Sequence, residues 1–153
     1  MKIHIGLDAG INTGFAAMEV HSRTFKELET YQFWEATYRL QEYHRQFKDR
    51  KIDLVVFVED VIANKPRFER KLPDGIRDIE AYKDKMSQNV GENKAHCKLL
   101  IQWCEDRDIP IRRVRPSQAS MTKLDPGKFQ ALTGYTGRTS SHTRDAAMLV
   151  FRS

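Results

Sequence analysis

The sequence predicts a single α/β domain built on a mixed five-stranded sheet, with helices on both faces of that sheet. Three strand-like runs come first, separated by turn residues, and they indicate an antiparallel meander. Helical and strand-like segments then alternate, which is typical of parallel strands joined by helices. The run from Ile52 to Val58 is almost continuously apolar, as expected for a strand buried on both faces.

The antiparallel part of the sheet is expected within the first 33 residues. Apolar residues alternate along Lys2 to Asp8, and a second run covers Phe15 to Val20. The turn-forming residues 9–14 between the two runs predict a β-hairpin. Thr24 to Phe33 is expected to add a third antiparallel strand, although its apolar and aromatic residues alternate imperfectly.

Helices and strands alternate in the rest of the chain, and residues 1–153 fit one domain. The helical spacing of apolar residues predicts one helix from Ala36 to Arg50 and another from Asn89 to Arg107. Ile109 to Val114 follows as the fifth strand. The chain closes with a short helix that carries the apolar residues Ala146, Met148, Leu149 and Val150.

Residues 62–86 differ in character from the segments around them. Pro66, Pro73 and Gly75 interrupt regular structure. The segment is also rich in basic residues, namely Lys65, Arg67, Arg70, Lys71, Arg77, Lys83 and Lys85. We therefore predict an exposed basic insertion within the domain.

The overall charge favours a polyanionic partner, because the net charge is +5 and the isoelectric point is near 9.3. The sequence has no run of 18 apolar residues, and its first residues lack the apolar stretch of a secretory signal. We therefore expect a cytoplasmic protein without a membrane partner. Cys97 and Cys104 fall two turns apart on one predicted helix, too far to bridge, and are expected to be reduced.

Three acidic residues stand where strands end or the last helix begins. Asp8 follows the first strand, Glu59 follows the fourth strand, and Asp145 lies in the first turns of the last helix. If the first and fourth strands are neighbours, Asp8 and Glu59 meet at one edge of the sheet, and a helix packed there adds Asp145. His142 shares a helical face with Asp145 because the two are three residues apart. Such clustered carboxylates repel one another, and a divalent cation relieves the repulsion.

Each of these residues, taken alone, also has a purely structural explanation. Asp8 precedes Ala-Gly and fits a turn-forming role equally well. Glu59 fits a solvated strand end, and Asp145 fits a carboxylate that stabilises a helix N-terminus. His142 alone is more typical of an ordinary residue near a helix start than of a ligand. Only the combination of the four favours a catalytic site.

The motifs around these residues resemble those of RuvC-type Holliday-junction resolvases. Ile5 to Ala16 reads IGLDAGINTGFA and is similar to the family's opening motif, with Ala9 where the family commonly has proline. Val56 to Glu59 resembles the second acidic motif, and His142 to Leu149 resembles the motif of the C-terminal helix. The three motifs occur in the family's order and span nearly the whole chain. The resemblance implies an RNase H-like fold, and the chain's length is similar to that of the compact phage resolvases.

The resemblance implies hydrolysis of a phosphodiester with two Mg²⁺ ions, for which Mn²⁺ is able to substitute. The metal ligands that it implies are Asp8, Glu59, His142 and Asp145. Asp60 is not included, because along an extended strand its side chain points away from that of Glu59.

An assisting lysine precedes the last helix in the family, and Lys128 lies in the corresponding region of this chain. An ammonium group there would stabilise phosphate charge in the transition state. Lys123 competes for this role, and a plain solvent-exposed lysine is the more common explanation of Lys128.

Basic residues are expected to neutralise the phosphates of branched DNA, and Phe68 either stacks on bases or packs within the protein. The candidate DNA-binding residues are Arg67, Phe68, Arg70, Lys71, Arg77, Arg112, Arg113 and Arg115.

The expected substrate is a Holliday junction or other branched DNA in a bacterial cell or a phage-infected host. A homodimer is expected, because symmetric cutting of a four-way junction needs two sites related by a two-fold axis. Two alternatives stay open: a nuclease that acts on RNA–DNA hybrid, and a catalytically silent nucleic-acid-binding domain of the same fold.

Overall fold

The computed structural model describes residues 1–50, 52–63, 75–115 and 123–153. The helices and strands follow in the order β1 (Lys2–Asp8), β2 (Asn12–Glu19), β3 (Thr24–Gln32), α1 (Phe33–Arg50), β4 (Asp53–Glu59), the 3₁₀ turn η1 (Val61–Ala63), α2 (Ile79–Glu105), β5 (Ile111–Val114), α3 (Pro126–Thr133) and α4 (Ser141–Phe151). The predicted candidates Arg67, Phe68, Arg70 and Lys71 lie outside the described residues.

The five strands form one mixed sheet in the order β3-β2-β1-β4-β5. β1 pairs with β2 and β2 with β3 in antiparallel fashion, whereas β1 with β4 and β4 with β5 are parallel pairs. The expected meander followed by parallel strands is therefore confirmed. Because β1 and β4 are parallel neighbours, their carboxyl ends, which carry Asp8 and Glu59, lie at the same edge of the sheet.

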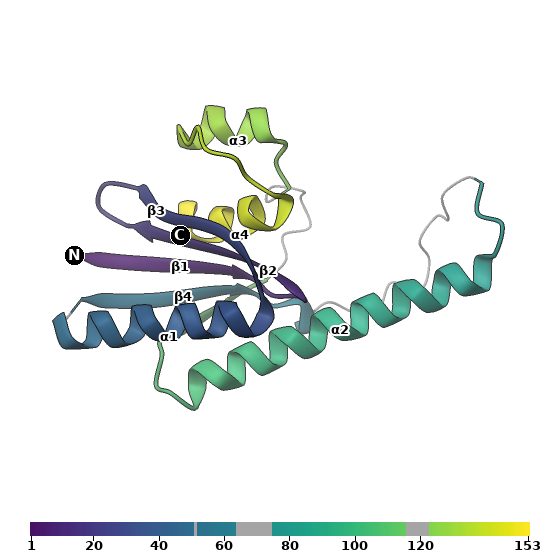
Figure 1. The fold of residues 1–153 in the computed structure, drawn as a ribbon, viewed down its shortest axis with the longest axis horizontal. Helices are drawn as coiled ribbons and strands as arrows, with labels where there is room; N and C mark the ends of the chain where they lie inside the picture. The colour runs from purple at the N-terminus through teal and green to yellow at the C-terminus, as the bar shows by residue number, and fades with distance from the viewer. Residues whose placement is uncertain (51, 64–74, 116–122) are drawn as a thin grey trace.

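Helices cover both faces of the sheet, as the sequence predicted (Figure 1). One face packs against α1 and α2 through a core that includes Ile5, Val56 and Leu100. The other face packs against α3 and α4 through a second core that includes Phe57 and Met148. Side chains alternate along each strand, so β1 directs its isoleucines into the first core and the intervening residues toward α4.

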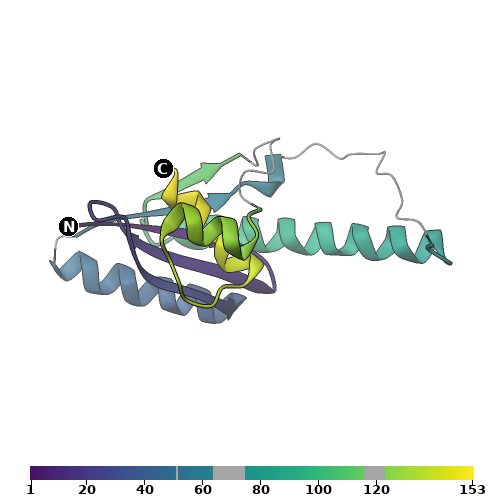
Figure 2. The same cartoon turned by 90° about the horizontal axis from the view of Figure 1, so that it is seen from above.

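Helix α2 is longer than the sequence indicated, because it begins at Ile79 and not at Asn89. The lack of regular structure predicted for 62–86 is therefore wrong for residues 79–86, whereas the exposure predicted for them agrees with the structure. Every helix breaker in the segment precedes Asp78, whose side chain accepts from the Ala81 amide and caps the helix. The extension projects beyond the sheet (Figure 2), and the buried side chains of α2 begin only at Cys97.

The sequence interpretation missed helix α3, which interrupts the predicted tail. Its signals are local: Asp125 caps the helix through the Lys128 amide, and Pro126 occupies the first turn. Gly134 ends the helix at a φ of 70°, a conformation that favours glycine. The eight-residue helix has too few apolar positions for periodicity to reveal it.

The two cysteines agree with the expectation, since both are free and buried in the first core. Among the residues that the structure describes, no helix is long and apolar enough to cross a bilayer.

Two glycines allow α4 to approach the sheet backbone closely. A β-carbon at Gly6 would overlap the Ala146 carbonyl oxygen, and one at Gly14 would overlap the His142 carbonyl oxygen. Gly14 pairs directly with Asp8 across β1 and β2. The first turn of α4 therefore lies against the end of β1 only because these two sheet positions lack side chains.

Changing Gly14 to alanine is expected to lower the free energy of unfolding by about 1–3 kcal/mol, because the added methyl group meets helix backbone that has no room to move. Urea-induced unfolding measures the effect. Gly91→Ala is the matched control, since nothing lies within 4 Å of the added carbon on exposed α2. The control is expected to be neutral or stabilising by up to about 1 kcal/mol. Equal effects of the two changes would contradict the packing argument.

Candidate active site

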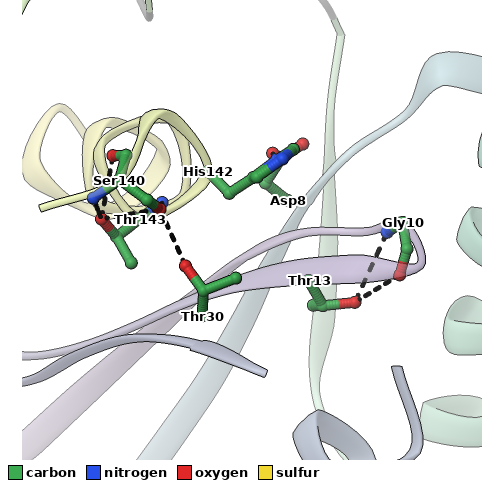
Figure 3. A network of polar contacts seen from close by, with 7 residues as sticks. All are labelled: Asp8, Gly10, Thr13, Thr30, Ser140, His142 and Thr143. Carbon is green, nitrogen blue, oxygen red and sulfur yellow. Dashed lines mark hydrogen bonds and ion pairs between the residues drawn. The ribbon is translucent and has the colours of Figure 1, made fainter. Parts of the chain in front are cut away.

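Asp8 and His142 meet at the carboxyl edge of the sheet (Figure 3). Asp8 ends β1, and His142 lies in the first turn of α4. The His142 Nδ1 donates to the Asp8 Oδ2 over 2.8 Å. The contact joins residues 134 positions apart in the sequence and shows that β1 and α4 deliver their polar ends to the same place.

The start of α4 is fixed by a reciprocal capping arrangement. The Ser140 Oγ accepts from the Thr143 amide at 3.0 Å, and the Thr143 Oγ1 accepts from the Ser140 amide at 2.9 Å. The Ser140 hydroxyl also contacts the Thr30 hydroxyl of β3 at 2.7 Å (Figure 3). These contacts tie the helix start to the sheet and so set the direction in which His142 points.

The turn that follows Asp8 is closed by a buried threonine (Figure 3). The Thr13 Oγ1 donates to the Gly10 carbonyl at 2.8 Å and accepts from the Gly10 amide at 3.4 Å. Because both polar groups of Gly10 are satisfied within the turn, the backbone that carries Asp8 is held in one conformation.

Glu59 ends β4 on the same face of the sheet as Asp8. The Cys97 thiol of α2 donates to the Glu59 carbonyl at 3.4 Å and anchors the strand end. The following residue, Asp60, accepts from the Ile62 amide at 3.2 Å.

The three carboxyl groups lie close enough to repel one another. Burial raises the pKa of Asp145 to about 6, and repulsion from Asp8 adds to the shift. Burial, then repulsion from Asp8 and Asp145, also raises the pKa of Glu59. Burial raises the pKa of Asp8 as well, although the hydrogen bond from His142 opposes the shift. This accumulation of unfavourable charge is typical of functional sites.

Among the lysines that the structure describes, Lys123 is the one whose charge lowers the pKa of Asp8, Glu59 and Asp145. Lys128 lies instead on α3, where its Nζ pairs with the Asp125 Oδ2 at 3.3 Å and its side chain is 76% exposed. The structure thus brings the competing lysine, and not Lys128, to the site. The Asp125-Pro126 helix start was the signal in the sequence that placed Lys128 in a helical first turn.

The donor groups are chemically suited to a divalent cation, since carboxylate oxygens are the ligands that Mg²⁺ prefers and imidazole also accepts Mn²⁺. As their side chains lie, however, no three or more His, Cys, Asp or Glu residues within the described ranges are arranged to hold a metal ion. His142 occupies one oxygen of Asp8. The set therefore fits a cation by its chemistry, and the described side chains do not enclose one as they lie.

The predicted arginines of β5 do not share one surface. Arg112 lies over the Phe57 ring, 5.9 Å from its centre, on the same face of the sheet as the carboxyl groups. Arg113 points to the other face, where it pairs with Glu105 of α2 at 3.1 Å. Arg115 is exposed just after β5, and Arg77 is exposed just before α2. Of the two arginines within β5, Arg112 is thus the one on the face that carries the site.

A solved structure has a fold similar to that of this chain. Over 99% of this chain and 91% of the other, the fold is similar to that of T. thermophilus RuvC in complex with Holliday junction substrate, with a TM-score of 0.59 and 14% sequence identity. The chain has a RuvC-like, RNase H-like fold. No protein-family model and no curated protein sequence matches it. The fold that the motifs implied is therefore confirmed, at a sequence identity that shows the fold alone.

The raised pKa of Asp145 predicts that metal-free protein loses stability as the pH rises from about 4 through about 6. The free energy of unfolding keeps its full value while Asp145 is protonated in both the folded and the unfolded state. It falls as the pH rises because Asp145 ionises less readily in the folded protein. Asp145→Asn is expected to flatten this slope and to stabilise the metal-free protein at pH 7 by about 1 kcal/mol, after allowance for solvent screening of a half-exposed group.

Thermal unfolding in a chelator, followed from pH 4 to pH 8, measures the slope. Asp84→Asn, on the exposed extension of α2, is the matched control and is expected to leave it unchanged. If stability changes with pH in the same way in Asp145→Asn and in wild type, Asp145 is not the group whose ionisation lowers the stability.

Proposed function

We propose that the chain is a metal-dependent endonuclease that cuts Holliday junctions or other branched DNA. The observation that carries the proposal is the meeting of Asp8, Glu59, His142 and Asp145 at one edge of a RuvC-like sheet. The structural neighbour is a RuvC in complex with a Holliday junction, which supports branched DNA as the substrate class.

The residues that would hold two Mg²⁺ ions, or Mn²⁺ in their place, are Asp8, Glu59, His142 and Asp145. When bound, such ions supply the Lewis acidity that phosphodiester hydrolysis needs. The chain's own part begins with ionisation of three carboxyl groups whose pKa values are all raised. Their mutual repulsion is relieved on binding a cation, so the site is better suited to the loaded state than to the empty one.

Lys123 is the candidate for the assisting cation in this proposal. Its ammonium group acts on all three carboxyl groups and is exposed to an approaching phosphate. A positive charge held there would stabilise the negative charge that develops on the phosphate in the transition state.

DNA is proposed to cross the face that carries α4 and the edge strand β5. Arg112 lies on this face, and Arg115 follows the carboxyl end of β5, which is parallel to β4 and ends at the site edge of the sheet. Their contacts would be to phosphates, which position a duplex without reading its sequence. Arg77, which is exposed just before the projecting part of α2, is proposed to extend the contact.

A four-way junction assay in Mg²⁺ tests the proposal. Wild-type protein is expected to cut the junction symmetrically, and Asp8→Asn is expected to abolish cutting while leaving binding intact, because it removes a ligand charge and keeps the shape. Asp53→Asn, exposed at the opposite end of β4, is the matched control and is expected to cut normally. Sedimentation of the same wild-type sample is expected to show a homodimer.

The outcomes separate the alternatives. Cutting of RNA–DNA hybrid in preference to the junction would identify a hybrid nuclease. Binding without cleavage of any substrate would identify a silent nucleic-acid-binding domain. Normal cutting by Asp8→Asn would place the active site elsewhere.

A further inference from the structure

Arg144 of α4 holds together two segments that are far apart along the chain. Its Nε donates to the Leu124 carbonyl at 2.7 Å. Its Nη1 donates to the Thr139 carbonyl at 3.2 Å and to the Thr139 Oγ1 at 3.1 Å. Leu124 precedes α3 and Thr139 follows it. One guanidinium therefore bonds the segments on both sides of α3 to α4, the helix that carries Asp145.

We propose that Arg144 is a positioning residue, which holds Lys123 over the carboxyl groups by anchoring the adjacent Leu124 carbonyl. This inference deepens the proposed nuclease function and rests on it. Lys123 is itself exposed, and its neighbour Leu124 is partly buried against the second core. The Arg144 bond adds a polar restraint to that apolar contact and fixes the backbone immediately beside Lys123.

The location of Arg144 argues against a role as an ordinary helix residue. A cation near the N-terminus of a helix is disfavoured by the helix dipole. Arg144 lies only four residues after the cap Ser140, in a helix start that favours negative charge. Its charge is instead met by two backbone carbonyls and a hydroxyl, which form charge-assisted hydrogen bonds in a partly buried setting. Arg144 is therefore explained by its hydrogen bonds to Leu124 and Thr139 and not by a contribution to the stability of α4 itself.

The fork of the guanidinium suits this task better than an ammonium would. The two nitrogens Nε and Nη1 point in different directions in one plane, so they reach Leu124 and Thr139 together. A lysine at this position carries its three donors on a single nitrogen and lacks the rigid planar fork that spans the two segments.

A double-mutant cycle on the full chain tests the inference with a four-way junction and Mg²⁺. Lys123→Met and Arg144→Met are each expected to lower kcat by on the order of 10²-fold, the effect typical of losing one group that stabilises transition-state charge. The double variant is expected to be no slower than Lys123→Met alone, because Arg144 acts through Lys123. Arg144→Lys is expected to retain an intermediate rate. The proposal would be overturned if the fold-loss of kcat in the double variant were the product of the two single losses. It would also be overturned if Arg144→Met had the wild-type kcat.

Amide hydrogen exchange in metal-free protein provides a readout that does not depend on activity. The amides of Lys128 and Phe129 bond to Asp125, which follows the anchored Leu124, and they are expected to exchange at least about tenfold faster in Arg144→Met than in wild type, because the local anchor is lost. Arg152→Met, which removes one positive charge at the other end of α4, is the matched control and is expected to leave these amides unchanged. Unchanged exchange in Arg144→Met would also overturn the proposal.

Failure of the proposed function and failure of the Arg144 proposal give different results in these experiments. If wild-type protein cuts no nucleic acid, the proposed function fails, and the exchange rates still decide whether Arg144 anchors the Lys123 segment. If Arg144→Met does not fold, Arg144→Lys takes its place in both measurements. Exchange faster than wild type in Arg144→Lys would then support the anchor, and wild-type exchange would overturn it.

Discussion

The close approach of α4 to the backbone of β1 and β2 is the constraint on which the rest of the site depends. Gly6 and Gly14 leave room for the helix backbone, and the Ser140 cap fixes where the helix begins. Together they bring His142 within hydrogen-bond distance of Asp8 and place Asp145 close enough to repel it. Without this approach, the carboxyl ends of β1 and β4 would carry two acidic groups but no complete cluster.

Bringing the three carboxyl groups together is electrostatically unfavourable, and the neighbouring side chains offset this effect only in part. Burial and mutual repulsion raise the pKa of all three carboxyl groups, while His142 and Lys123 supply the opposing effects. Arg144 extends this arrangement by tying the segment beside Lys123 to the same helix that carries two members of the cluster. Because the three carboxyl groups are unfavourable together in the empty site and the charge of Lys123 acts on them, we propose that the site binds divalent ions and a phosphate.

Strand periodicity explains why much of this could be predicted from the sequence. The expected pairing of the first and fourth strands placed Asp8 and Glu59 at one edge of the sheet, and alternation excluded Asp60. The three-residue spacing placed His142 beside Asp145. The extension of α2 and the whole of α3 were not predicted, because neither buries enough apolar surface to give a periodic signal. Lys123 could not be preferred over Lys128, since that choice depends on how α3 directs the chain between β5 and α4.

The most direct test of the central claim is a crystal structure of the protein soaked in Mn²⁺, with the ions located by their anomalous scattering. The account predicts two ions between Asp8, Glu59 and Asp145, with the His142 side chain turned from Asp8 toward a metal. Ions bound elsewhere, or carboxyl groups that stay apart at saturating Mn²⁺, would contradict it.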